Sequence, residues 1–310
     1  MRHNQTNNKT GLFVTALYST QVKRAAILAI LTALLLIIVK GFAWWQTGSV
    51  SILASITDSM LDLFASFINM LILRFALMPA DRNHSFGHGK AESLAMLAQS
   101  AFISGSAVFL LLQSIHRLNA PQVLTNTHIG IGVTLFSIVI TLLLVWYQRR
   151  VIAQTDSPAI KADHLHYQTD LLMNVTILIS LSLTLWDMIW ADAVFAVFIA
   201  LYILLSAAKM FVDAVQLLLD IALPEQEVSQ IEEIVLSDPR VLGFHDLRTR
   251  RSGSVRFIQL HLELDDHLSF LEAHDITDSL ERRLRQAFPL VDIVIHHEPT
   301  SVVQAESINV

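Results

Sequence analysis

The sequence predicts an α-helical membrane protein, in which a bundle of six transmembrane helices is followed by a cytosolic ferredoxin-like αββαβ domain. Hydrophobic residues make up 53% of the 310-residue chain, and the mean hydropathy is +0.53. These values exceed what a soluble core of this size requires. The apolar residues gather in long runs before residue 219, whereas the pattern after Asp220 is that of a soluble domain.

Six apolar runs are long enough to cross a hydrocarbon core of about 30 Å, which takes roughly 20 helical residues. The segment before them is polar and lacks the apolar core of a removable signal peptide. We therefore predict a cytosolic N-terminal tail at 1–21 and a transmembrane domain at 22–219. The predicted spans lie near 22–45, 50–78, 91–118, 127–148, 158–186 and 192–218.

The orientation follows from the distribution of Lys and Arg, which gather before the first span and in alternate loops. The positive-inside rule then places both termini in the cytoplasm. Trp residues at the predicted outer ends favour the same orientation, because aromatic side chains prefer the membrane interface. The basic residues are Lys23, Arg24, Arg74, Arg82, Lys90, Arg149, Arg150 and Lys161, and the Trp residues are Trp44, Trp45, Trp186 and Trp190.

The C-terminal part alternates between helical and strand patterns in the order αββαβ. We predict helices at 225–237 and 268–288, strands at 241–249, 255–264 and 291–297, a cytosolic domain over 220–299 and a flexible tail at 300–310. From Asp220 onward there are 17 acidic and 8 basic residues. This acidic balance argues against nucleic acid as a partner and suits a domain that concentrates cations.

Two predicted spans carry pairs of ionisable residues. Asp58 and Asp62 lie four residues apart on the second span, and His166 and Asp170 lie four apart on the fifth. This spacing places both members of a pair on one helix face. Ionisable groups inside a membrane cost roughly 2.5 to 3.5 kcal/mol on insertion scales, so they indicate a functional site. A single such residue could simply bond a neighbouring helix, but two matched pairs favour a site.

The two pairs are expected to meet near the middle of the membrane. Three carboxylates in a medium of low dielectric constant repel one another unless a divalent cation offsets their charge. The chain has no Cys, so a metal must be held by imidazole nitrogen and carboxylate oxygen. Three oxygens and one nitrogen suit a tetrahedral Zn²⁺ site.

Two further clusters could bind metal outside the membrane. In the inner loop, Asp81, His84 and His88 lie on a Gly-containing turn, although polar loops often carry His by chance. In the cytosolic domain, His residues gather on and near the predicted strands, although surface His is usually just solvated, as we expect for His267. The residues of this second cluster are His245, His261, His274, His296, His297 and Glu298.

The chain resembles the cation diffusion facilitators over residues 25–299. The resemblance rests on the motifs at 57–62, 79–92, 162–170, 243–250, 258–263 and 295–296. It implies a homodimeric proton antiporter of a bacterial inner membrane that exports Zn²⁺, with Fe²⁺ and Cd²⁺ as alternative ions. It also implies three metal sites: Asp58, Asp62, His166 and Asp170 for transport; Asp81, His84 and His88 in the loop; and His245, His261, His274, His296 and Glu298 in a binuclear cytosolic site.

The resemblance implies two further features of the cytosolic side. Metal bound there would tighten the dimer and regulate transport, so we expect 220–299 to be a metal-sensing domain. Lys90 and Asp220 match an inter-helix ion pair near the dimer interface. The last strand departs from the family pattern, because His297 and Glu298 stand where the family tends to have Gln and Asp. Glu reaches one methylene further than Asp, so the cytosolic site departs from the family pattern, whereas the transport site matches it.

Two other classes of protein could also hold metal in a membrane. An intramembrane metal-dependent hydrolase would need an open coordination position for water. The chain lacks a His-Glu-x-x-His motif, and a site with four protein ligands favours carriage over catalysis, so we expect no enzyme. A metal-binding membrane sensor or scaffold that transports nothing stays open as an alternative.

Overall fold

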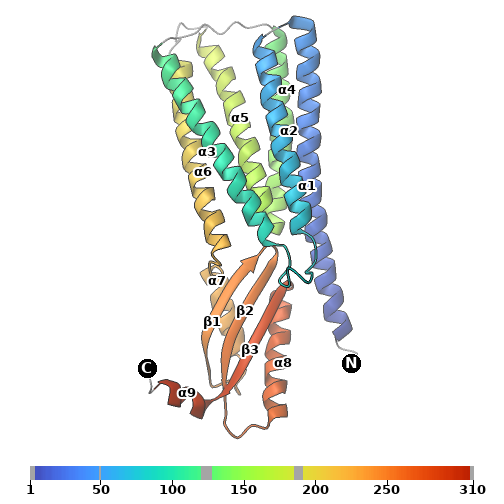
Figure 1. Cartoon of the computed structure of the whole chain (residues 1–310), viewed down its shortest axis with the longest axis vertical. Coiled ribbons are helices and arrows are strands. Elements are labelled where there is room, and N and C mark those ends of the chain that lie inside the picture. The colour runs from blue at the N-terminus through green and yellow to red at the C-terminus, as the bar shows by residue number, and fades with distance from the viewer. Residues whose placement is uncertain (1–3, 49, 120–127, 185–190, 308–310) are drawn as a thin grey trace. The chain divides into compact units, whose positions relative to one another are not determined.

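The computed structural model describes residues 4–48, 50–119, 128–184 and 191–307. Contacts divide the chain into two compact units, Ser19–Val215 on one side and Met1–Tyr18 with Gln216–Val310 on the other, and each is described by itself. The helices and strands in chain order are α1 Asn4–Thr47, α2 Val50–Ala76, α3 Lys90–Asn119, α4 His128–Thr155, α5 Pro158–Thr184, α6 Ala191–Leu218, α7 Glu225–Leu236, β1 Gly243–Ser252, β2 Val255–Leu264, α8 Phe270–Ala287, β3 Val291–Pro299 and α9 Thr300–Ser307 (Figure 1).

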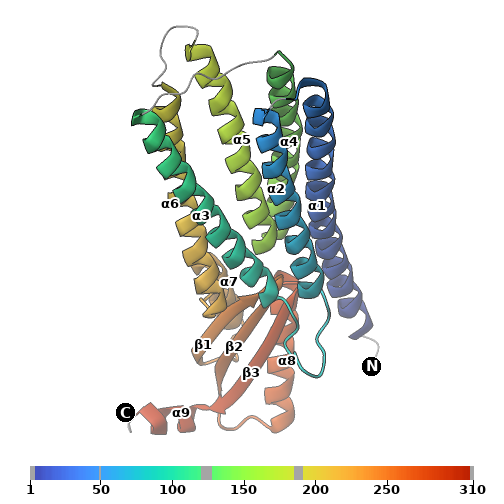
Figure 2. The ribbon, with the colours of Figure 1, turned by 45° about the horizontal axis from the view of Figure 1, so that its top comes forward.

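The first unit is a bundle of long helices (Figures 1 and 2). Helix α5 packs against α2, α3 and α4. A small apolar cluster of Ala29, Leu144 and Tyr167 joins α1, α4 and α5. The helix that carries the predicted His and Asp ligands therefore has neighbours on several sides.

Among the described residues, five helices are long and apolar enough to cross a membrane. These are Ala16–Thr47, Ser55–Ala76, Lys90–His116, Ile129–Thr155 and Val194–Leu218. Helix α5 is not among them, and it carries Lys161, Asp163 and Asp170 along its length. Together with α5, these helices form the six-helix bundle that the sequence predicts. The polarity of α5 is the first structural sign that this helix has a role other than filling the bilayer.

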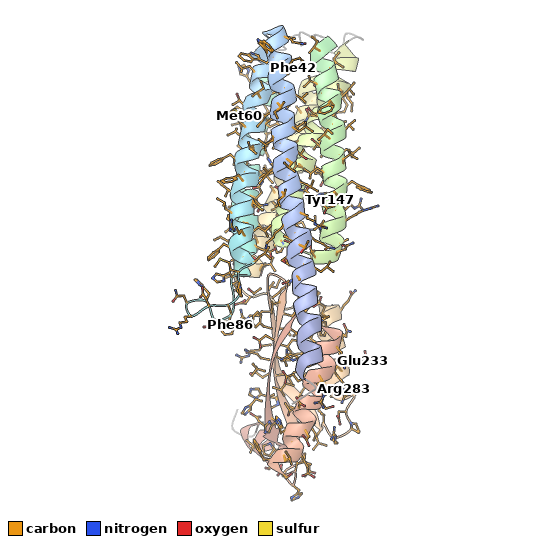
Figure 3. All side chains as sticks on the ribbon, turned by 90° about the vertical axis from the view of Figure 1, so that its right-hand side faces the viewer. Phe42, Met60, Phe86, Tyr147, Glu233 and Arg283 are labelled. Atoms are coloured by element: carbon orange, nitrogen blue, oxygen red, sulfur yellow. The ribbon has the colours of Figure 1, made fainter. Side chains whose placement is uncertain are left out.

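The surface of the bundle is apolar, as expected of helices in lipid. Phe42 is 56% exposed and Met60 is 58% exposed, and Figure 3 shows Met60 projecting away from the bundle. Met60 lies between Asp58 and Asp62 in the sequence, so the polar face of α2 lies on a different side of the helix from Met60.

Residues 4–21 of the predicted N-terminal tail are helical, because α1 begins at Asn4. The cytosolic placement of this tail stays a prediction. No Pro precedes Pro79, so nothing in this stretch removes a backbone donor and ends the helix. Once the apolar segment has formed its first turns, adding residues at its N-terminal end costs little. Trp186 and Trp190, used above for orientation, lie outside the described residues.

The C-terminal domain has the predicted order αββαβ. Its sheet has the order β1-β2-β3, in which β1 and β2 are antiparallel and β2 and β3 are parallel. Gly253, at the β1–β2 turn, has φ 58°, a left-handed conformation that glycine adopts at little cost. The parallel pair is connected through α8, as parallel strands require a crossover.

The core of this domain lies on one face of the sheet. Alternate residues of β2 are buried there, from Ile258 to Leu264, together with Ile231 of α7 and Ile276, Leu280 and Leu284 of α8. Because side chains alternate across a strand, the intervening positions of β2 point to the opposite face. That face carries His261 and Glu263.

Residues 300–307 of the predicted flexible tail form the helix α9, and the flexibility of this tail stays a prediction. The carboxylate of Asp266 holds the start of this helix: it accepts hydrogen bonds from the Thr300 hydroxyl and from the backbone N–H of Ser301, both at 3.0 Å. A carboxylate at a helix N-terminus satisfies backbone donors that would otherwise lack a partner. This contact comes from a turn distant in sequence, so the local pattern did not predict it.

Candidate metal centres

The first candidate centre lies inside the helix bundle and joins α2 to α5. His166 Nε2 lies 3.2 Å from Asp62 Oδ1 and 3.9 Å from Asp170 Oδ2. One possible ligand atom from each of these three residues lies within 4.8 Å of the others. The His166 side chain is only 7% exposed. The structure thus brings together three of the four residues that the sequence predicts for the membrane site.

Asp58 is the fourth predicted residue, and the structure does not place it within this close group. It lies one turn before Asp62 on α2, and its side chain is exposed. Its spacing from Asp62 keeps both carboxylates on neighbouring parts of one helix face.

A clamp of hydrogen bonds holds α5 next to α2 and α1 beside this centre. Tyr167, the residue after His166, shares a hydrogen bond of 2.9 Å with the Ser66 hydroxyl of α2. The Tyr167 hydroxyl also donates to the backbone carbonyl of Ala29 in α1 at 3.1 Å. The Tyr167 ring is buried, so this clamp fixes the neighbouring His166 against α2.

Two ligand atoms of this centre are buried without a hydrogen bond in the described residues. They are His166 Nε2 and Asp170 Oδ2, whose only close polar contacts there are the ion-pair contacts within the centre itself. Buried polar atoms are normally paired, because leaving one unpaired costs about 1 to 3 kcal/mol. Carboxylate oxygen and imidazole nitrogen are also the ligands that Zn²⁺ prefers when no thiolate is available. The arrangement can therefore hold a divalent cation and release it again.

Other buried polar residues surround this centre, and sequence reasoning did not single them out. Lys40 of α1 donates to the Ser59 hydroxyl of α2 at 2.7 Å. Gln148 of α4 donates to Asp163 of α5 at 2.7 Å, and both side chains are buried. Lys40 and Asp163 could have been found from the sequence, because charged residues are rare in membrane helices and indicate a functional role.

The second candidate centre is the loop between α2 and α3. One possible ligand atom each of Asp81, His84 and His88 lies within 4.8 Å of the others. Asp81 lies 3.5 Å from His84 Nδ1 and 3.4 Å from His88 Nε2. The ring centroids of His84 and His88 are 4.6 Å apart. All three residues that the sequence predicts for the loop site are therefore close together.

The backbone of this loop prepares Asp81 to bind a cation. The backbone N–H groups of His84 and Asn83 donate to Asp81 Oδ1 at 2.7 and 2.9 Å. These hydrogen bonds, with that from His84 the largest contribution, lower the pKa of Asp81 below its usual value. Gly87, with φ 79°, allows the tight turn that returns the chain to His88.

The third candidate centre lies on the open face of the C-terminal sheet. The strand register pairs His245 with His261 and His261 with His296. Glu298 reaches all three imidazoles: 3.4 Å to His245 Nε2, 3.0 Å to His261 Nδ1 and 3.3 Å to His296 Nε2. The tightest group comprises His245, His261 and Glu298. Cross-strand neighbours, rather than sequence neighbours, build this centre.

Not every residue of the predicted cytosolic His cluster lies in this group. His274 is on α8, which packs on the opposite face of the sheet, so the chain does not bring it to the other residues. His297 follows His296 on β3 and points to the opposite face of the sheet. Its ring centroid lies 6.1 Å from that of Phe270. Glu263 was not singled out from the sequence, yet it lies 2.9 Å from His245 Nδ1. The sequence does not show that Glu263 lies across from His245, so the carboxylate partner of this imidazole could not be inferred.

The predicted ion pair of Lys90 with Asp220 concerns residues of different units and stays a prediction. Within its own unit, Asp220 lies 3.4 Å from Arg250.

Comparison with known proteins gives a family for both parts of the chain. Residues 26–219 match the model of the cation efflux transmembrane domain, and residues 223–300 match that of the cation efflux protein cytoplasmic domain.

Individual relatives cover nearly the whole chain. The chain is 54% identical over 286 residues to the cation-efflux pump FieF of Pectobacterium atrosepticum, covering 92% of this chain and 95% of the relative. It is 54% identical over 289 residues to FieF of Yersinia pestis, covering 93% of this chain and 96% of the relative. A solved chain of CzrB is 42% identical and aligns with 25% of this chain and 96% of its own length, with a TM-score of 0.24.

Proposed function

The chain belongs to the cation efflux family, and from this premise we propose that it exports divalent metal cations across the inner membrane, with Zn²⁺ as its main substrate. It does so as a multi-pass homodimer that exchanges metal for protons, with both termini in the cytoplasm. Residues 22–219 carry the ion, and residues 220–299 sense metal. Fe²⁺ and Cd²⁺ are alternative transported ions.

The observation that carries this proposal is the group of Asp62, His166 and Asp170 within the helix bundle. Two carboxylates and an imidazole have no structural use in lipid that would offset their cost, whereas a divalent cation supplies the missing charge. Asp58 supplies the fourth ligand from the neighbouring turn of α2. A mixed nitrogen and oxygen ligand set favours Zn²⁺ over Mn²⁺, which prefers oxygen alone.

Proton exchange follows from the chemistry of the ligands. Carboxylates and imidazole bind metal only in their deprotonated forms, so protons and metal compete for the same atoms. If the centre opens to the cytoplasm in one state and to the outside in another, an inward proton gradient favours loading inside and release outside. No water needs to be activated, so the protein acts as a carrier and not as an enzyme.

The loop and sheet centres serve regulation in this proposal. Both lie outside the membrane helices, where metal can bind from the cytoplasm without crossing the bilayer. Metal bound to His245, His261, His296 and Glu298 favours the dimer and biases the helices through it. The loop residues Asp81, His84 and His88 hold a separate ion.

Zinc uptake into sealed vesicles tests the proposal and distinguishes it from the alternative hypothesis of a sensor or scaffold that transports nothing. Purified protein is reconstituted into vesicles loaded with a zinc-sensitive dye, with and without a pH gradient of each sign. We expect zinc flux that speeds up when the gradient drives protons in the opposite direction. Zinc binding with no flux in any gradient would identify a sensor and contradict the proposal. Parallel runs with Cd²⁺, Fe²⁺ and Mn²⁺ rank the substrates.

A further inference from the structure

A buried lysine lies beside the membrane centre and has no role in the proposal so far. Lys40 belongs to the span Ala16–Thr47 of α1. It is only 6% exposed, whereas Ile38 and Phe42, two residues away on either side, are 67% and 56% exposed. Lysine in a membrane helix usually extends its amine to the interface. Lys40 instead points to the interior of the bundle.

The hydrogen bonds of Lys40 direct its amine to the turn of α2 that carries the transport ligands. The amine donates to the Ser59 hydroxyl at 2.7 Å and to the backbone carbonyl of Ser55 at 3.2 Å. Ser59 is 1% exposed; it follows Asp58 directly and precedes Asp62 by three residues. The charged groups within electrostatic reach of the amine are Asp58, Asp62 and Asp170. These are the three carboxylates of the membrane centre.

We propose that Lys40 is a specificity-determining residue of the membrane centre, because its fixed positive charge leaves the three carboxylates with a net charge of minus two, which matches a divalent cation. The inference rests on the proposed function of that centre. Lys40 has no need to ligate the metal. It acts through space, in a setting where a charge is felt far more strongly than in water.

This role predicts how the centre responds to ions of different charge. Lys40 repels any cation that enters the centre, and the repulsion grows in proportion to the charge of that cation. Its removal should therefore favour a trivalent ion more than a divalent one. A lysine that only fastens α1 to α2 would give no such dependence, since its loss would disturb the centre for every ion alike.

The test measures metal binding by the full-length protein in a background that carries His84→Ala and His261→Ala, so that the loop and sheet centres contribute little. Zn²⁺ binding is measured by calorimetry and Tb³⁺ binding by luminescence, at the same near-neutral pH, where both ions stay in solution. Three further changes are compared: Lys40→Met removes the charge and keeps the length, Lys40→Arg keeps the charge, and Ser59→Ala removes the hydrogen-bond partner but leaves the charge.

We expect Lys40→Met to raise the affinity for Zn²⁺ by on the order of tenfold and the affinity for Tb³⁺ by more than that. Lys40→Arg and Ser59→Ala should both stay within about threefold of the background, because the positive charge is retained. Comparing each ion with itself removes the intrinsic preference of that ion for oxygen or nitrogen ligands.

Three outcomes would overturn the inference. Unchanged affinity in Lys40→Met would mean that the amine carries no effective charge at the centre. An equal gain for both ions, or a loss for both that Ser59→Ala reproduces, would assign Lys40 a structural role. Zinc flux by the native chain in vesicles is measured in parallel. Absence of that flux would contradict the proposed function, whereas the binding results decide the role of Lys40.

Discussion

The membrane centre and the sheet centre use the same ligand types but assemble them in different ways. In the membrane, Asp62, His166 and Asp170 come from two helices, and the His166 side chain is 7% exposed. On the sheet, His245, His261 and Glu298 come from three strands, and the two imidazoles are each 35% exposed. Water can solvate the second group, whereas in lipid the charge of the first that Lys40 does not offset has only a bound cation or protons to balance it. We infer that occupancy of the membrane centre is required for flux and that occupancy of the sheet centre only adjusts it.

The largest expected effect comes from Asp62→Asn. This change keeps the shape of the side chain but removes one carboxylate of the membrane centre. Zinc flux in vesicles should fall by roughly a hundredfold or more, because losing a charged ligand that is buried costs several kcal/mol.

Asp58→Asn tests the proposed fourth ligand in the same way, and Asp58 lies outside the close group with an exposed side chain. It should reduce flux less than Asp62→Asn does. Equal losses from the two variants would show that both carboxylates hold the ion to the same extent. If Asp62→Asn kept the native zinc flux, the membrane centre would not be required for transport, and the distinction from the sheet centre would be wrong.

The sheet centre is expected to give the next largest effect, on binding and not on basal flux. Glu298→Gln removes the carboxylate that contacts His245, His261 and His296. Zinc affinity of this centre should fall by roughly ten- to a hundredfold, as measured by calorimetry in an Asp62→Asn background.

Glu263→Gln is the control for the sheet centre, because among the sheet imidazoles Glu263 contacts His245 alone. It should weaken zinc binding less than Glu298→Gln does. In an otherwise native chain, Glu298→Gln should leave zinc flux near its native rate at saturating zinc. Loss of flux as complete as in Asp62→Asn would contradict a purely regulatory role for the sheet.

A third prediction concerns the stability of the cytosolic domain and leaves both centres intact. The Asp238 carboxylate, 5% exposed, lies 2.8 Å from both Arg240 and Arg283. The hydrogen bond from the Arg240 side chain, the largest contribution, lowers the pKa of Asp238 to about 2. Asp238→Asn should therefore destabilise this domain by about 1 to 2 kcal/mol at neutral pH.

The pH dependence of this contribution has a definite sign. Because the pKa of Asp238 is depressed in the folded domain, its stabilisation is present above about pH 4 and is lost as the pH falls toward 2. Hydrogen exchange of β1 and β2 in the full chain measures it. Asp278→Asn, which breaks an exposed pair with Arg282, should change exchange very little. The same pH profile in native protein and Asp238→Asn would disprove the assignment.

The smallest expected effect is at α9. Asp266→Ala removes the acceptor for Thr300 and Ser301. Amide exchange over 300–307 should speed up by roughly two- to tenfold. The hydrogen bond from the Ser301 backbone contributes most to holding the pKa of Asp266 below its usual range. The contact should consequently persist until the pH falls below about 4. Unchanged exchange in Asp266→Ala would show that packing, not this carboxylate, holds α9.

The sequence predicts the membrane ligands better than the sheet ligands, for a physical reason. Residues four apart on a helix share a face whatever surrounds the helix, so Asp62 and the pair His166 and Asp170 could be inferred from spacing. In the sheet, the ligands meet only through strand register. The irregularity in β1 between His245 and Arg248 that sets this register is not visible in the residue pattern.

The features that could not be predicted depend on contacts between distant segments. Lys40 lies in an apolar run, and only its hydrogen bond to Ser59 shows that it faces the turn of α2 between Asp58 and Asp62. The C-terminal residues look like a frayed tail until Asp266 is seen at the start of α9. His274 is one of several His in an acidic domain, and only the packing of α8 shows that it lies behind the sheet. Local pattern carries no information on any of these three contacts.

The most direct test of the account is the position of bound zinc in the full-length protein. Diffraction data collected on either side of the zinc absorption edge locate the ion without reference to its ligands. We predict an anomalous peak between Asp62, His166 and Asp170, which disappears in Asp62→Asn while the peak at His261 and Glu298 remains. Zinc at the loop and sheet alone, with the native protein still carrying zinc across vesicles, would contradict the assignment of the membrane centre.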